Sequence, residues 1–188
     1  CNLNHFILSK TSEEAAMYDK KKLIAGNWKM NGSLASLNEI RVLKQLIKDV
    51  SCDVALCLPA TLLTEAIRVV DKDKLIIGAQ NCHYERSGTH TGEISAEMLH
   101  DLQVKLVILG HSERRVAHNE SSAMIKKKAK TSNDYGLTTI ICVGETEKEK
   151  LSKKTYKIIT SQLTDSLPET ATFKNTIIAY EPIWAIGT

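Results

Sequence analysis

Short runs of consecutive apolar residues recur along the chain, and each run is rich in β-branched side chains. The apolar positions follow one another instead of alternating with polar positions, which is typical of parallel strands buried on both faces. We therefore predict six strands: Leu23–Ala25, Val54–Leu58, Leu75–Gly78, Leu106–Leu109, Thr138–Val143 and Thr176–Tyr180.

The segments between these runs place their apolar residues at helical spacing. Residues 33–50 carry apolar side chains on one helical face, and Ser33 is suited to cap the start of that helix. The same spacing predicts four more helices: Thr61–Val70, Ser95–Leu102, Ser121–Tyr135 and Lys150–Leu163. Gly136 stands where a helix ending near Tyr135 would need a left-handed residue.

The order of these elements predicts the fold class. Six strands with a helix after each of the first five form a repeated βα unit, so we expect an α/β protein with a parallel sheet. Such repeats suit either a doubly wound sheet or a (β/α)₈ barrel, and a barrel needs about 250 residues. The chain has 188 residues. Periodicity alone leaves both architectures open.

Composition and charge narrow the function classes. The chain is 43% hydrophobic and 25% charged, as in a soluble globular protein, and its net charge of +3 is too small to imply a nucleic-acid partner. No apolar run approaches the roughly 18 residues of a membrane-spanning helix. The triplet Lys126–Lys128 lies on a predicted helix, and we expect it to form a solvated face.

The cysteine pattern indicates the compartment. None of the five cysteines forms a C-x-x-C pair, so the sequence implies neither a zinc site nor a thioredoxin-like motif: Cys1, Cys52, Cys57, Cys82 and Cys142. Scattered thiols of this kind are typical of a reducing cytoplasm. Residues 1–16 lack the charged start and long apolar core of a secretory signal.

Polar side chains gather where the predicted strands end. Asn27 and Lys29 follow the first strand, His111 follows the fourth, and Glu181 follows the sixth. In both parallel architectures the reacting groups lie at the carboxyl ends of the strands, so these side chains should meet at one rim. The sequence implies no cofactor, since there is no metal-ligand cluster and no G-x-G-x-x-G after the first strand.

The strings around these residues carry a family resemblance. In order and spacing the chain resembles triosephosphate isomerase from about Lys22 to Thr188 through these strings: A-G-N-W-K-M-N-G, G-A-Q-N, T-G-E-I-S, L-G-H-S-E-R-R, C-V-G-E-T and A-Y-E-P-I-W-A-I-G-T. The resemblance implies a (β/α)₈ TIM barrel of which this chain holds about six of the eight βα units. We expect residues 21–188 to form that barrel and residues 1–20 to be an N-terminal extension without an assigned role.

The resemblance also implies a reaction and its residues. The family interconverts dihydroxyacetone phosphate and glyceraldehyde 3-phosphate in glycolysis and gluconeogenesis, without a cofactor. Glu181 would be the base, and His111, as a neutral imidazole, would polarise the carbonyl and move protons between the two oxygens of the enediolate. Lys29 and Asn27 would stabilise the enediolate oxygen, with Lys29 also near the phosphate. Glu113 would orient Lys29 through an ion pair or take part in proton transfer.

Other implied roles concern the lid, the dimer and the chain's departures from the family. Gly187, in the lid that follows the base, would bring its backbone N–H to a phosphate oxygen, and Thr91 would reach into the neighbouring subunit of a homodimer. Cys142 would be a buried structural thiol. The chain departs from the family at His90, where an apolar aromatic residue is usual, and at Glu149–Thr155 (E-K-L-S-K-K-T), where E-R-E-A-G-x-T is usual.

The family continues beyond Thr188 with two further βα units, and in barrels the loops after the last strands commonly build the phosphate site. We therefore expect this 188-residue stretch by itself to be weakly active or inactive. Two rival hypotheses stay open: an aldolase that forms a Schiff base through Lys29, and a binding role for a degraded barrel.

Overall fold

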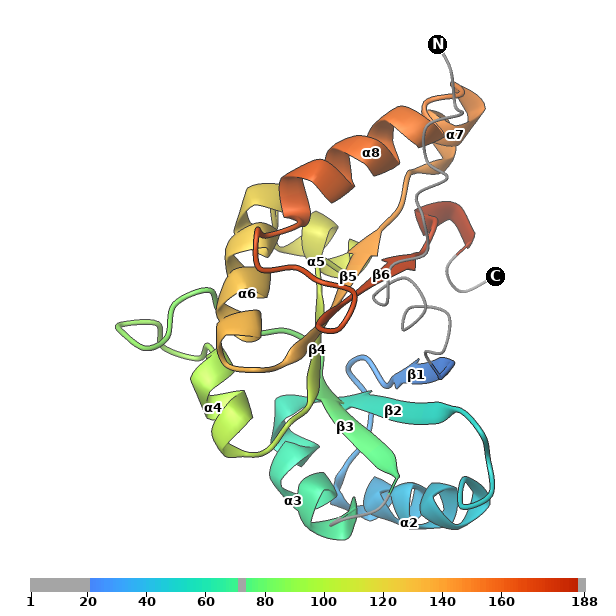
Figure 1. Ribbon diagram of the computed structural model, residues 1–188, viewed down its shortest axis with the longest axis vertical. Helices are drawn as coiled ribbons and strands as arrows, with labels where there is room; N and C mark the ends of the chain where they lie inside the picture. The colour runs from blue at the N-terminus through green and yellow to red at the C-terminus, as the bar shows by residue number, and fades with distance from the viewer. Residues whose placement is uncertain (1–20, 71–73, 186–188) are drawn as a thin grey trace, which may run out of the picture.

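The computed structural model describes residues 21–70 and 74–185 (Figure 1). Six strands form one parallel sheet in which each strand pairs with the next along the chain. These are β1 (Leu23–Asn27), β2 (Asp53–Leu58), β3 (Leu75–Ala79), β4 (Leu106–Leu109), β5 (Thr138–Val143) and β6 (Thr176–Tyr180). All six predicted strands are therefore confirmed, and the sheet curls like part of a barrel wall.

Helices connect the strands and cover the outer face of the curled sheet (Figure 1). The described elements are η1 (Leu34–Ser36), α2 (Leu37–Leu46), α3 (Ala60–Val70), α4 (Ala96–Asp101), α5 (Ser112–Ala117), α6 (Ser122–Asp134), α7 (Glu147–Leu151), α8 (Thr155–Ser166) and η2 (Ile183–Ala185). Gly136 ends α6 as predicted: its φ is +75°, and the next N–H, that of Leu137, donates to Ser132 O.

The central strands β2 to β5 are buried on both faces, which explains their continuous apolar runs, whereas the edge strands β1 and β6 contain no fully buried residue. One set of side chains packs under the helices, with Leu56, Leu58 and Ile141 among them. The alternate positions form a separate cluster on the inner face of the curled sheet: Ala55, Cys57, Leu106, Ile108, Ile140 and Cys142. Successive residues of a strand point to opposite faces, so both sets must be apolar here.

Two helices differ from the prediction. The single helix expected over Lys150–Leu163 is wrong, because the structure has α7 and α8 with a break between them. A capping box between Thr146 and Glu149 starts α7 early, and Lys153 ends it at a φ of +56°. Lys153 is the residue that stands where the resembled family has glycine. The short helix α5 was not predicted, because it buries none of its residues and so shows no apolar face.

The expectation of a solvated lysine triplet is wrong for one of its members. Lys128 is only 3% exposed and donates to Glu120 Oε1 at 2.7 Å and to Asn81 Oδ1 at 2.9 Å. Arg114 donates to the same Glu120 oxygen at 2.6 Å. A buried ammonium needs such partners, and an acidic residue eight positions away is a weak sequence signal for one. The predicted N-terminal extension, residues 1–20, lies outside the described residues, so that domain division stays a prediction.

Candidate active site at the carboxyl ends of the strands

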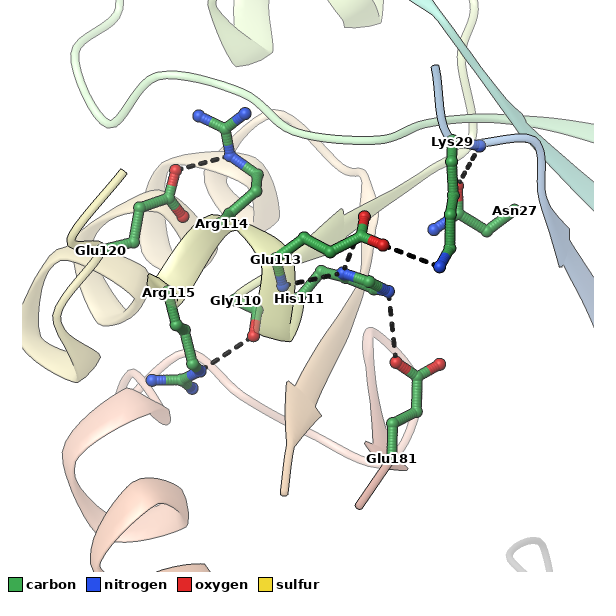
Figure 2. A network of polar contacts seen from close by, with 9 residues as sticks. All are labelled: Asn27, Lys29, Gly110, His111, Glu113, Arg114, Arg115, Glu120 and Glu181. Atoms are coloured by element: carbon green, nitrogen blue, oxygen red, sulfur yellow. Dashed lines mark hydrogen bonds and ion pairs between the residues drawn. The ribbon is translucent and has the colours of Figure 1, made fainter. Parts of the chain in front are cut away.

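The predicted polar residues come together at the carboxyl rim of the sheet (Figure 2). Asn27 is the last residue of β1, His111 follows β4 after one glycine, and Glu181 directly follows β6. A cavity of about 580 Å³ opens at this rim, and its lining includes Asn27, Lys29, His111 and Glu113. Glu181 lies on the other side of His111, where it lines a much smaller cavity.

Asn27, Lys29 and Glu113 form a connected set. The backbone N–H of Lys29 donates to Asn27 Oδ1 at 2.8 Å, and Lys29 takes a φ of +53°, a conformation that costs energy outside glycine and recurs at functional sites. Lys29 Nζ donates to Glu113 Oε1 at 2.7 Å. This hydrogen bond from Lys29 lowers the pKa of the Glu113 carboxyl, so the pair holds two opposite charges.

His111 is buried, and its tautomer follows from its partners. It precedes α5, and its Nδ1 accepts the backbone N–H of Glu113 at 3.3 Å. Because Nδ1 accepts, the neutral ring carries its proton on Nε2. Nε2 lies 3.5 Å from Glu181 Oε2, as Figure 2 shows. The ring thus presents an N–H to the side of the site where the carboxylate stands.

The backbone of β5 holds Glu181 in place. Its N–H donates to Val143 O at 2.9 Å, and Gly144 packs directly against its carbonyl group. Glu181 Oε2 is buried and accepts no hydrogen bond from the residues that the structure describes; the contact with His111 has the distance of an ion pair only. A carboxylate oxygen without a donor is available to accept a proton.

Cys142 lies beside this carboxylate as a buried thiol. Burial, and after it the charge of Glu181, raises the pKa of Cys142 to about 12. A thiol with that pKa stays protonated near neutral pH and is not a nucleophile. The structural role expected for Cys142 agrees with its position in the inner cluster of the sheet.

The segment after Glu181 is tied to the loop between β5 and α7. Glu145 is 1% exposed, and its carboxylate accepts from Trp184 Nε1 at 3.2 Å and from the Tyr180 hydroxyl at 3.1 Å. Lys150 Nζ stands 3.1 Å from the centre of the Trp184 ring. Gly187, predicted to hold phosphate, lies outside the described residues.

Thr91 lies on the long loop between β3 and α4, which projects from the body of the molecule (Figure 1). The Thr91 side chain is exposed. Within the same loop the His90 ring packs against the His83 ring, with centres 4.1 Å apart and planes tilted by 35°, so a histidine pair stands where an apolar aromatic residue was expected. At the base of this projecting loop, the backbone N–H of His83 donates a hydrogen bond to the carbonyl oxygen of Ile94 at 2.7 Å and so holds its two ends together.

Comparison with known proteins identifies the family to which this chain belongs. The family model described as triosephosphate isomerase matches residues 22–188. The chain belongs to the triosephosphate isomerase family. A triosephosphate isomerase of Rhizobium meliloti is 50% identical over 173 residues, which cover 90% of this chain and 68% of that protein. The triosephosphate isomerase of Bartonella quintana is 46% identical over 174 residues, covering 89% of this chain and 67% of that protein.

A solved structure of the family shows the same fold. The crystal structure of triosephosphate isomerase from Bartonella henselae matches with a TM-score of 0.85 and 44% identity, covering 88% of this chain and 69% of that one. The chain therefore spans about two thirds of the length of these relatives. Its six strands form the corresponding part of the (β/α)₈ TIM barrel, as predicted, and the doubly wound alternative is excluded.

Two further observations concern the described residues alone. Residues 21–70 and 74–185 contain no group of three or more His, Cys, Asp or Glu side chains that could hold a metal ion. Among the same residues, no helix is long and apolar enough to cross a membrane.

Proposed function

We propose that the protein interconverts dihydroxyacetone phosphate and glyceraldehyde 3-phosphate, with Glu181 and His111 as its acid–base pair. The observation that carries this proposal is their arrangement: a carboxylate oxygen without a hydrogen-bond donor and an imidazole N–H lie 3.5 Å apart at the carboxyl rim. Membership of the triosephosphate isomerase family supports the same reaction.

In this proposal Glu181 removes a proton from the carbon beside the substrate carbonyl, and the electron pair of that C–H bond forms the enediolate. The carboxylic acid then returns the proton to the neighbouring carbon, while His111 moves a proton from the hydroxyl oxygen of the first carbon to the former carbonyl oxygen. One carbon is oxidised and its neighbour is reduced, so the isomerisation involves no net change in oxidation state. His111 donates its Nε2 hydrogen bond to the oxygen on which charge develops. Action as a neutral imidazole is established for this family, and the hydrogen bond accepted by Nδ1 supports it here.

Lys29 and Asn27 would stabilise the same developing charge. Their side chains line the cavity beside His111, and the removal of one such preorganised donor typically costs about 3–4 kcal/mol of transition-state stabilisation. Glu113 would orient Lys29 through the 2.7 Å ion pair. That pairing argues against the aldolase hypothesis, because an imine-forming lysine must be a desolvated neutral amine. Borohydride reduction with a triose phosphate should therefore trap no adduct at Lys29.

The remaining assignments follow the family and belong to the same proposal. The backbone N–H of Gly187 would bind the substrate phosphate together with Lys29. The protein would act as a homodimer in which Thr91 of one subunit approaches the site of the other; the exposed projection that carries Thr91 supports this arrangement. The free thiols of Cys57, Cys82 and Cys142 support a location in the cytoplasm.

The test is a Glu181→Gln substitution in the protein expressed from its complete gene. Glutamine keeps the shape of the side chain and cannot accept the proton, so we expect kcat to fall by about 10²–10⁴-fold with the circular dichroism spectrum unchanged. Glu169→Gln is the matched control, because Glu169 is an exposed carboxylate on a distant surface. An unchanged rate in Glu181→Gln would rule out the proposed mechanism.

A further inference from the structure

Arg115 follows His111 on α5, and its guanidinium points away from His111 and Lys29 (Figure 2). Its Nε donates to the carbonyl oxygen of Gly110 at 2.8 Å, and its Nη2 donates to the carbonyl oxygen of Cys142 at 3.1 Å. Gly110 follows the last residue of β4, and Cys142 is near the end of β5. One guanidinium thus joins the carboxyl ends of two neighbouring strands.

The other donors of Arg115 reach two helices. Nη1 donates to Ser122 Oγ at the start of α6 at 3.1 Å, and Nη2 donates to Ser166 Oγ at the end of α8 at 3.3 Å. In the part of the chain that the structure describes, no carboxylate forms an ion pair with Arg115. Arginine is normally placed where its fork meets a carboxylate or phosphate. Here burial lowers the pKa of the guanidinium, and every acceptor is neutral.

The two carbonyls that Arg115 binds belong to the backbone that carries the acid–base pair. Gly110 directly precedes His111 and has a φ of +68°, so the chain turns sharply at this point. Cys142 directly precedes Val143 and Gly144, which hold the Glu181 backbone through a hydrogen bond and a close contact. A shift of either strand end would therefore change the distance between His111 Nε2 and Glu181 Oε2.

We propose that Arg115 is a positioning residue that fixes the strand ends of β4 and β5 and thereby the separation of His111 from Glu181. The fork geometry is required, because Nε and Nη2 bind two carbonyls at the carboxyl ends of two different strands. A lysine keeps the charge and supplies only one nitrogen. The inference rests on the roles proposed above for His111 and Glu181.

The first experiment compares Arg115→Lys with Arg68→Lys, a matched change at an exposed arginine of α3. A misplacement of about 1 Å in an active site can lower turnover about 100-fold, so we expect kcat to fall by about that factor in Arg115→Lys with KM unchanged. Arg68→Lys should match the wild type. In Arg115→Ala, added guanidinium should restore part of the lost kcat. A raised KM with an unchanged kcat, or no rescue, would overturn the inference.

A second experiment separates positioning from general support of the fold. The double variant Ser122→Ala/Ser166→Ala removes the two hydroxyl acceptors and leaves both carbonyl contacts of Arg115 in place. We expect it to lose thermal stability and keep its kcat. A fall in kcat as large as that in Arg115→Lys would overturn the inference, because the contacts of Arg115 would then affect turnover only by stabilising the fold.

The double variant also tests the inference if the Arg115 variants fail to fold. A retained kcat would then indicate that the two carbonyl contacts, and not the two hydroxyl contacts, position His111 and Glu181. The two proposals fail in different ways. A wild-type protein without isomerase activity would remove the proposed function, whereas full activity in a folded Arg115→Lys variant would remove only this inference.

Discussion

Gly144 supports the backbone of Glu181 so closely that no side chain fits between them. A β-carbon at Gly144 would lie 2.1 Å from the carbonyl oxygen of Glu181 and 2.8 Å from its carbonyl carbon. The shortest ordinary contacts between carbon and oxygen are about 3.3 Å, so a Gly144→Ala substitution requires a movement of about 1 Å. The neighbouring atoms are backbone, which cannot rotate away as a flexible side chain could.

The size of the effect follows from that movement. We expect Gly144→Ala to lower kcat about 100-fold, because a displacement of about 1 Å at a reacting group has a cost of that order. A 100-fold loss corresponds to about 2.7 kcal/mol of activation free energy. Overpacking should also lower the free energy of unfolding by about 1–3 kcal/mol.

Steady-state kinetics in the direction of glyceraldehyde 3-phosphate and urea denaturation would measure the two effects separately. Gly136→Ala is the control: its φ of +75° makes alanine costly, yet no atom lies within 4 Å of the added β-carbon. This control should lose stability and retain kcat. If Gly144→Ala kept the wild-type kcat, the argument that this contact sets the position of Glu181 would be refuted.

Two further predictions concern stability. Lys153→Gly should raise the free energy of unfolding by about 0.5–1 kcal/mol in urea titrations. The left-handed φ of +56° costs lysine about 1–2 kcal/mol, and the greater entropy of glycine in the unfolded state offsets part of the gain from removing that cost. Lys154→Gly is the control: at a φ of −99° it should give no gain. Burial raises the pKa of Cys57 and of Cys142 from 9.0 to about 12. Above pH 9 the unfolded state loses these protons first, so each thiol should lower the free energy of unfolding by about 1.4 kcal/mol per pH unit up to pH 12. Cys57→Ala should remove the contribution of one of the two thiols from the pH dependence of the free energy of unfolding. A slope equal to that of the wild type would contradict the raised pKa of Cys57.

The sequence predicts the central strands β2 to β5 well because they are buried on two faces, and that double burial leaves a continuous apolar run. The edge strands β1 and β6 carry the same kind of apolar run, although none of their residues is fully buried. It also places Asn27, His111 and Glu181 at one rim, because parallel strands leave no alternative. The break between α7 and α8 was not predictable from apolar spacing, since it depends on the backbone conformation of one lysine, Lys153.

The supporting residues of the site were missed for a different reason. Arg115 is placed by acceptors up to 51 positions away in the sequence, and such distant contacts leave no local pattern. Gly144 does carry a signal, since a glycine stands directly after a buried strand, but the signal does not reveal that its neighbour is Glu181. The side chains proposed to contact the substrate thus follow from the fold, whereas the groups that hold them require coordinates.

The strand order has a consequence for how the protein can fold during its synthesis on the ribosome. Every strand from β2 to β6 pairs with the strand made immediately before it. Each newly synthesised strand can therefore pair with the exposed edge of the strand before it. The sheet can in this way gain strands in the order in which they are translated. His111 follows β4 and Glu181 follows β6, so the proposed acid–base pair is completed only when the sixth strand has joined the sheet.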